Sequence, residues 1–110
     1  MKARLFFADA KVKKAFGKLS SSSKSEDEKI RGWLTKAFKE IQQDAFCGIQ
    51  IPKRLIPKEY IKKYGINNLW KYNLPEGWRL LYSIAADEKN VVCIIIEWLD
   101  HKNYERRFGY

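Results

Sequence analysis

Cysteine, histidine and proline are scarce in this sequence of 110 residues, which has two Cys, one His and three Pro. Cys47 and Cys93 have no CxxC partner and no neighbouring His, so the sequence signals neither a zinc site nor a disulfide framework. We expect both to be free thiols. No GxGxxG, GxxxxGK[ST] or HExxH pattern occurs either, so none of these motifs indicates a metal or a cofactor.

Long apolar runs are also missing from the sequence. The longest one covers residues 91–96, far short of the roughly 20 apolar residues that a membrane-spanning helix needs. The opening MKARLFF is soon followed by Asp9 and Lys11, which interrupt the apolar core that a signal peptide requires. We therefore expect a cytoplasmic protein that does not associate with a membrane.

Aromatic residues, in contrast, are plentiful, with four Trp, six Tyr and six Phe. A folded chain of this length buries roughly two thirds of the surface that its unfolded form exposes, which is enough for a hydrophobic core without disulfides or a structural metal. We expect residues 1–110 to form one domain.

Positive charge dominates, with 22 Lys and Arg against 13 Asp and Glu and a net charge of +9. Residues 1–19 have six basic and one acidic side chain, and residues 46–64 have five and one, so these segments contribute +5 and +4. The remaining segments are balanced. Clustered positive charge indicates a polyanionic partner, either nucleic acid or an acidic protein segment. A lysine-rich surface that only maintains solubility is the alternative.

The N-terminal half predicts one strand and two helices. Residues 2–8 indicate a strand, and apolar residues at helical spacing follow in residues 12–19. Ser25-x-x-Glu28 is typical of a capping box that starts a second helix. That helix has one apolar stripe suited to packing on a sheet, formed by Ile30, Trp33, Leu34, Ala37, Phe38 and Ile41.

The C-terminal half predicts mainly strands. Residues 47–57 are punctuated by Gly and Pro and indicate an extended connection, followed by a short helix over residues 57–64 that Gly65 ends. Three strand-like runs then form an antiparallel meander, at residues 69–74, 78–85 and 91–99. The predicted fold is α+β: an N-terminal strand and two helices packed on a mainly antiparallel sheet with a C-terminal three-strand meander.

One arginine lies within the second strand of this meander. The two-residue period of a strand places Arg79 on the same face as Leu81 and Ser83. A guanidinium on an apolar strand needs a partner, because burying it unpaired is costly. The partner is either a carboxylate of the same chain, such as Glu97 on the neighbouring strand, or an external phosphate held by the bidentate fork.

The final residues, 97–110, contain the richest set of reactive side chains. They include the only histidine, His101, and a tyrosine three residues later, Tyr104, with carboxylates on both sides and two adjacent arginines. Tyr104 would lie about one helical turn beyond His101 if a turn forms there. A histidine at the end of a central strand is a candidate general acid or base.

Together these residues resemble a known family. The run Asn68-Leu-Trp-Lys-Tyr72, the run Gly77-Trp-Arg-Leu-Leu-Tyr82, the apolar strand and the final His101-x-x-Tyr104 are similar to the RelE/ParE superfamily of toxins from type II toxin–antitoxin systems. The order of the predicted elements matches that family over nearly the whole chain. The resemblance implies a RelE-like fold and a small acidic antitoxin as partner.

For ribonuclease members, the resemblance implies metal-independent cleavage of messenger RNA in the ribosomal A site, by attack of a ribose 2′-hydroxyl on the adjacent phosphate, with no cofactor. Arg79 would stabilise the phosphate, and His101 would act as general acid or base. Tyr104 would orient the RNA, stack on a base or transfer a proton. The second proton carrier would be Tyr104, a carboxylate such as Glu105, or a lysine.

The resemblance also implies a basic RNA-binding groove. Its members would be Lys53, Arg54, Lys58, Lys62, Lys63 and Lys71. Some nuclease members have a further arginine on the last strand, but residues 91–99 contain no basic side chain. Either Arg106 or Arg107 would then compensate the charge, or activity would be weak.

Three alternatives remain open from the sequence. ParE-like members of the same fold act on DNA gyrase and lack the nuclease residues. A second alternative is a protein that binds nucleic acid by charge and aromatic stacking without cleaving it. The third is an inactive toxin that retains antitoxin binding. The presence of both His101 and Tyr104 favours the nuclease.

Overall fold

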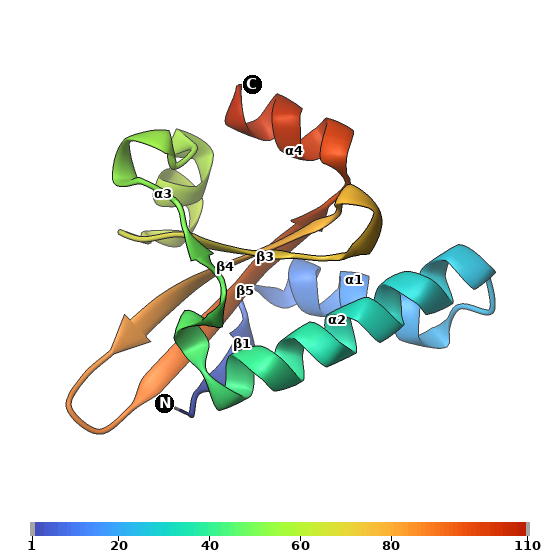
Figure 1. Cartoon of the computed structure of the whole chain (residues 1–110), viewed down its shortest axis with the longest axis horizontal. Coiled ribbons are helices and arrows are strands. Elements are labelled where there is room, and N and C mark those ends of the chain that lie inside the picture. Colours follow the sequence, from blue (N-terminus) through green and yellow to red (C-terminus); the bar gives the residue numbers. More distant parts are fainter. Residues whose placement is uncertain (1, 110) are drawn as a thin grey trace.

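The computed structural model describes residues 2–109 and has an α+β architecture, with helices on both faces of a five-stranded sheet (Figure 1). Its strands are β1 (Arg4–Phe7), β2 (Ile49–Gln50), β3 (Trp70–Asn73), β4 (Arg79–Ala86) and β5 (Val91–Leu99). Its helices are α1 (Ala10–Ser21), α2 (Ser25–Gln43), α3 (Lys58–Tyr64) and α4 (His101–Phe108). Short 3-10 turns occur at Ala45–Cys47, Lys53–Leu55 and Pro75–Gly77.

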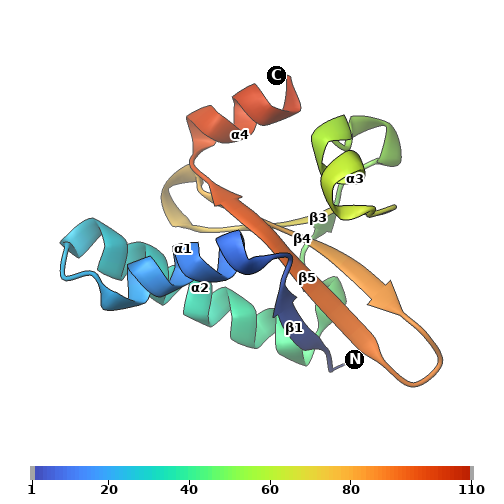
Figure 2. The same ribbon diagram turned by 180° about the vertical axis from the view of Figure 1, so that it is seen from behind.

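The sheet has the strand order β1-β5-β4-β3-β2. β3, β4 and β5 form the predicted antiparallel meander, and β2 adds antiparallel to β3. β1 pairs with β5 in parallel, which the α1–α2 hairpin visible in Figure 2 makes possible by carrying the chain away from the sheet. The predicted α+β class and mainly antiparallel sheet are therefore confirmed.

The first core lies between α1, α2 and one face of the sheet. Leu34, Ala37 and Ile41 of α2 are fully buried there with Tyr82 and Ile95 of the sheet. The apolar stripe predicted from the sequence therefore packs as expected, because its spacing places these side chains on one side of the helix.

The start of α2 differs from the prediction. Ser25 is the first helical residue and not the cap, and Lys24 precedes it without a capping side chain. The hydroxyl of Ser22 instead donates a hydrogen bond to Asp27 at 2.7 Å and accepts one from the backbone N–H of Lys24 at 3.2 Å. The predicted capping box is therefore wrong, because a serine three residues earlier orders the turn.

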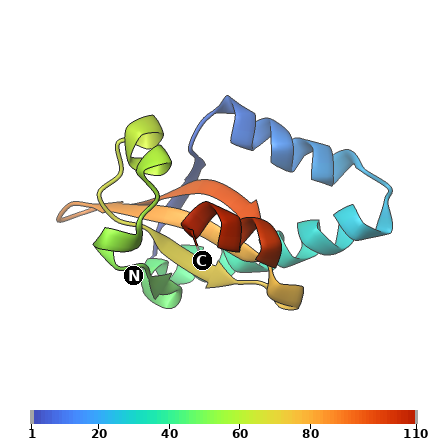
Figure 3. The same cartoon turned by 90° about the horizontal axis from the view of Figure 1, so that it is seen from above.

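The second core lies on the opposite face, where α3 and α4 stand over the sheet (Figure 3). Tyr60 of α3 and Tyr104 of α4 are buried there with Leu69, Leu81 and Ile96. α3 begins after Pro57 and ends at Gly65, whose φ of +64° suits glycine, as the sequence predicted.

A β-bulge in β5 decides which residues face the second core. Leu81 pairs with Glu97, but the next residue, Tyr82, pairs with Ile95, so Ile96 is the extra residue. Ile95 stays with the first core, whereas Ile96 turns to the second. The bulge thereby places the Glu97 carboxylate on the face that α3 and α4 cover.

The sequence analysis did not predict α4 as a helix. The carboxylate of Asp100 caps its start by accepting a hydrogen bond from the Asn103 N–H at 2.8 Å, and Gly109 ends it with a φ of +74°.

Cys47 and Cys93 are free, as expected. Within residues 2–109, no helix is long and apolar enough to cross a bilayer.

Candidate functional site

Three predicted site residues, two cationic and one phenolic, meet between α4 and the sheet. Lys71 lies on β3, Arg79 at the start of β4, and Tyr104 on α4. The Lys71 amine donates a hydrogen bond to the Tyr104 hydroxyl at 3.3 Å. The Arg79 guanidinium lies 5.4 Å from the centre of the Tyr104 ring. We call these three residues the Arg79 cluster.

Arg79 has no carboxylate partner within residues 2–109, although Glu97 lies on the neighbouring strand. Its Nη1 donates to the carbonyl of Trp78 at 3.2 Å, and its Nε is buried without a hydrogen-bond partner. Of the two partners considered from the sequence, the internal carboxylate is thus not used. A half-buried guanidinium in this state favours an anionic ligand, because a phosphate would satisfy its remaining donors.

Tyr104 is buried, with only 4% of its surface exposed. Its ring packs against Phe108 with the ring centres 4.5 Å apart, and the cations of Lys71 and Arg79 each lie 5.4 Å from its centre. A nucleic-acid base cannot stack on this ring unless these neighbours move. The hydroxyl, in contrast, accepts a hydrogen bond from the Lys71 amine, which suits proton transfer or positioning.

His101 begins the helical turn of α4 that leads to Tyr104, but its side chain is exposed whereas that of Tyr104 is buried. It is the first residue of α4, its side chain is 62% exposed, and its Nε2 pairs with Glu105 one turn later. Its Cβ lies against the Pro75–Gly77 turn, 3.1 Å from where a Cβ on Gly77 would be. No hydrogen bond within residues 2–109 joins His101 to Arg79.

The predicted RNA-binding residues lie on elements that cover the second core. Lys53 and Arg54 are exposed on the short turn before α3, and α3 itself exposes Lys58 and Lys62. Lys63 is also exposed but lies 3.9 Å from Asp9. These cations and the Arg79 cluster therefore share one side of the sheet, which is the arrangement a polyanion would need.

The two arginines at the end of α4 differ. Arg106 is exposed, whereas Arg107 pairs with Glu59 of α3 and approaches Glu97 of β5 with its Nε at 3.7 Å. Burial disfavours the charge of Arg107, but the two carboxylates outweigh this effect and raise its pKa. Its charge is therefore compensated inside the molecule.

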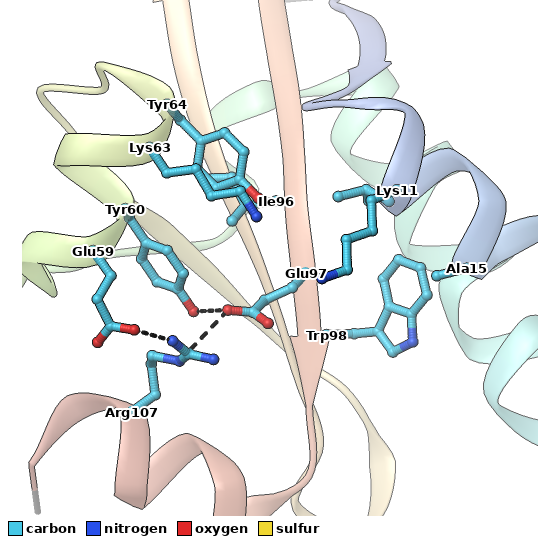
Figure 4. A pocket seen from close by; sticks show the side chains of 11 residues that line it. Lys11, Ala15, Glu59, Tyr60, Lys63, Tyr64, Ile96, Glu97, Trp98 and Arg107 are labelled. Atoms are coloured by element: carbon cyan, nitrogen blue, oxygen red, sulfur yellow. Dashed lines mark hydrogen bonds and ion pairs between the residues drawn. The ribbon is translucent and has the colours of Figure 1, made fainter.

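A pocket of about 400 Å³, which the sequence analysis missed, opens around Glu97 (Figure 4). α1, α3 and α4 surround it, and β5 forms its floor. The Glu97 carboxylate accepts a hydrogen bond from the Tyr60 hydroxyl. Burial and this carboxylate raise the pKa of Tyr60 far above its usual value, so the phenol stays protonated.

The signal that could have located this pocket was the isolated charge of Glu97 in an otherwise apolar strand. From the sequence, Glu97 was predicted only as a possible partner of Arg79, because the bulge that turns it toward α3 is not visible in the sequence.

Within residues 2–109, no group of three or more His, Cys, Asp or Glu side chains is arranged to hold a metal ion. Comparison with models of protein families, with the curated proteins and with the solved structures finds no match to this chain.

Proposed function

We propose that this protein is a RelE-like toxin that cleaves messenger RNA in the ribosomal A site, with the Arg79 cluster at the scissile phosphate. The observation that carries the proposal is the state of Arg79. Its guanidinium lies beside a lysine and a phenol and has no carboxylate partner within residues 2–109, whereas Arg107 has two. A cation kept without an internal counter-ion is suited to bind an external anion.

The proposed reaction needs three actions. A base takes the proton of the ribose 2′-hydroxyl, and the 2′-oxygen attacks the adjacent phosphorus. Arg79 and Lys71 stabilise the added negative charge of the phosphorane. The bond to the 5′-oxygen then breaks, and an acid protonates that oxygen, leaving a 2′,3′-cyclic phosphate and a 5′-hydroxyl.

Proton transfer would use the two groups at the ends of the first turn of α4. The Tyr104 hydroxyl, hydrogen-bonded to the Lys71 amine, can pass a proton through that contact. His101 would be the second proton carrier. Its exposed imidazole would have to leave Glu105 when RNA binds, which the high exposure of both side chains allows.

The partners follow from the charge. The exposed cations before and on α3 would hold the RNA backbone beside the Arg79 cluster. An acidic antitoxin would compete for the same surface, since the chain has a net charge of +9. Such a toxin would act in the cytoplasm, where the ribosomes are.

The test is to express the wild type, Arg79→Ala and His101→Ala in growing cells and to map messenger-RNA ends. Arg31→Ala is the matched control, because Arg31 is exposed on α2, which packs on the other face of the sheet. We expect cleavage within codons for the wild type and the control, and its loss in the other two variants. Cleavage that persists in Arg79→Ala would overturn the proposal.

A second candidate is favoured by one observation. His101 pairs with Glu105 at the surface, and no hydrogen bond within the described residues joins it to Arg79. This suits a protein that binds nucleic acid without cleaving it. Growth arrest with intact messages would support that candidate, and DNA damage in the same cells would indicate a gyrase poison.

A further inference from the structure

The pocket around Glu97 has aromatic walls and a small number of directed polar groups. Tyr60 and Tyr64 of α3 line one side, Trp98 of β5 lies toward α1 on the other, and Ile96 lies in the floor (Figure 4). A space of about 400 Å³ is large enough for a nucleobase and its sugar. Flat aromatic walls favour a flat ligand, because stacking stabilises it.

One atom in the pocket is an acceptor without a donor. The contacts of Glu97 with Tyr60 and Arg107 are both made by Oε2. Oε1 has no hydrogen-bond partner within residues 2–109, and the side chain is 29% exposed. A ligand in the pocket would therefore be recognised by the N–H groups that it offers to this carboxylate.

Two lysines lie at the rim of the pocket, and its exposed carboxylate, Glu59, is paired with Arg107. Lys11 of α1 and Lys63 of α3 reach over the pocket from opposite sides, and the Lys11 amine points across β5 (Figure 4). Two lysines at the mouth disfavour a cationic ligand, such as a polyamine or an arginine side chain. They favour one that has an anionic group outside the pocket and N–H donors inside it, which is the chemistry of a nucleotide.

Among the RNA bases, guanine fits these groups best. Its edge offers the parallel donors N1–H and N2–H, which the carboxylate can accept as a charge-assisted pair at Oε1 and at the second lone pair of Oε2, whose first accepts from Tyr60. Its O6 lies beside them and can accept from a lysine such as Lys11. Adenine and cytosine each offer only an amino donor on this edge, and uracil offers one N–H between two carbonyl oxygens that a carboxylate would repel.

We propose that this pocket binds a guanine base, with Glu97 as the acceptor and Lys11 as the donor. Its use in RNA recognition rests on the proposed function. Glu97 pairs with Leu81, and Arg79 with Leu99, so Glu97 and Arg79 are diagonal neighbours on one face with their Cα atoms roughly 7–8 Å apart. One RNA strand could therefore place a phosphate at Arg79 and a guanine in the pocket.

The experiment titrates the full chain with GMP, AMP, CMP, UMP and inorganic phosphate by calorimetry, without ribosomes or messenger RNA. We expect GMP to bind about tenfold more tightly than UMP, since a good bidentate contact discriminates by about 1–3 kcal/mol. Glu97→Gln should remove this preference. Lys11→Ala should lower the affinity for GMP. Lys18→Ala should leave it unchanged, because Lys18 is on the same helix but does not line the pocket.

Two further measurements complete the design. Thermal unfolding of Glu97→Gln shows whether the variant folds, and Lys11→Ala tests the same pocket from an exposed position. A short adenine-rich oligoribonucleotide with one guanine, compared with GMP, separates an RNA residue from a free nucleotide as the natural source. Either result supports the pocket.

The proposal is overturned if no nucleotide binds, if the four bind equally, or if folded Glu97→Gln binds GMP as the wild type does. These outcomes are independent of cleavage. Guanine binding without cleavage would support the guanine pocket and contradict the proposed nuclease activity. Cleavage that depends on Arg79 without guanine binding would support the nuclease activity and contradict the guanine pocket.

Discussion

Two arginines in similar surroundings differ in whether their charge is paired inside the molecule. Arg79 and Arg107 are both half-buried, and each lies over a tyrosine ring, Tyr104 and Tyr60 respectively. Arg107 is neutralised by two carboxylates, whereas Arg79 contacts a carbonyl and a phenol ring. Binding to a polyanion should therefore depend on Arg79 far more than on Arg107.

Tyr82 is a fully buried residue whose hydroxyl group makes two hydrogen bonds. Its hydroxyl donates to the Ala45 carbonyl at 2.8 Å and accepts from the Gly48 N–H at 3.2 Å. Tyr82→Phe leaves both groups unsatisfied, so we expect a loss of about 1–3 kcal/mol in the free energy of unfolding, measured by urea denaturation. Tyr72→Phe, at a half-exposed position, should change it by less than about 0.5 kcal/mol. Equal effects would contradict this account.

The same burial makes stability depend on alkaline pH. Desolvation raises the pKa of Tyr82, and burial with the Glu97 carboxylate raises that of Tyr60. Both phenols bind their protons more tightly in the folded state, so their stabilisation is complete below the ordinary pKa of about 10. It is lost as pH rises above that value. We expect the urea midpoint to fall between pH 10 and pH 11.5, and less steeply in Tyr60→Phe. A midpoint independent of pH in this range would contradict the prediction.

The two cysteines should differ in reactivity. Cys93 is fully buried, and burial raises its pKa to about 11. Partial burial and the nearby Asp44 also raise the pKa of Cys47, but its side chain is exposed and a reagent can reach it. A thiolate is the reactive form, so a thiol reagent at pH 8 should modify one cysteine per native chain and two in denaturant. Cys47→Ser should abolish the native reaction. Two fast-reacting thiols in the native protein would show that β5 opens readily.

At the scale of elements, the sequence predicted the helix that periodicity determines and both limits of α3, but not the cap of α2 or the helix α4, nor what packing determines. The apolar stripe of α2 and the Pro57 and Gly65 limits of α3 were readable, because each is a local property. The bulge at Ile96 is not local, since it arises where β5 must serve two cores. It changes the site, because it turns Glu97 toward Tyr60.

α4 and β2 were missed for different reasons. Asp100 and Gly109 are ordinary helix limits, so the sequence contains the signals for α4, but the prediction extended only to a possible turn between His101 and Tyr104. β2 has only two residues, Ile49–Gln50, and exists because β3 offers it a partner. For the candidate site, the sequence grouped Arg79 with Tyr104 and His101 and put Lys71 among the RNA-binding residues, whereas the structure joins Lys71 to Arg79 and Tyr104 and buries Tyr104.

The edge formed by β2 and β3 depends on a glycine. A Cβ on Gly48 would lie 2.5 Å from the Tyr82 hydroxyl and 2.7 Å from the Lys71 carbonyl, and the second atom is backbone that cannot move freely. Gly48→Ala should therefore cost about 1–3 kcal/mol of stability. Gly32 lies in the exposed middle of α2, and a Cβ there would have no neighbouring atom within 4 Å. Gly32→Ala should therefore increase the free energy of unfolding by about 0.5–1 kcal/mol. Thermal unfolding of both variants measures these effects. If Gly48→Ala left the stability unchanged, the chain at Gly48 would not lie this close to the Tyr82 hydroxyl and the Lys71 carbonyl.

At the scale of the whole molecule, the second face of the sheet is assembled from segments distant in sequence. α3 supplies the exposed lysines, β5 supplies Glu97, and α4 supplies Tyr104 and Arg107. Arg107 links all three, because it pairs with Glu59 of α3 and approaches Glu97 of β5. The position of the proposed catalytic helix is thereby tied to that of the proposed RNA-binding helix.

That link makes α4 sensitive to a residue outside the Arg79 cluster. A helix of eight residues is not stable in isolation, so α4 depends on its contacts with the body of the protein. In Arg107→Ala the helix loses its ion pairs to α3 and β5 but keeps the apolar packing of Tyr104 and Phe108 and the hydrogen bond between Lys71 and Tyr104. We expect hydrogen exchange of the α4 amides to accelerate about tenfold, with the β4 and β5 amides unchanged, because the helix opens locally. Arg106→Ala, one residue earlier and exposed, should leave exchange unaltered. If both variants exchange alike, the ion pairs across α3, β5 and α4 play no part in placing Tyr104 against Arg79, and the contacts of Tyr104 and Phe108 with the sheet hold α4.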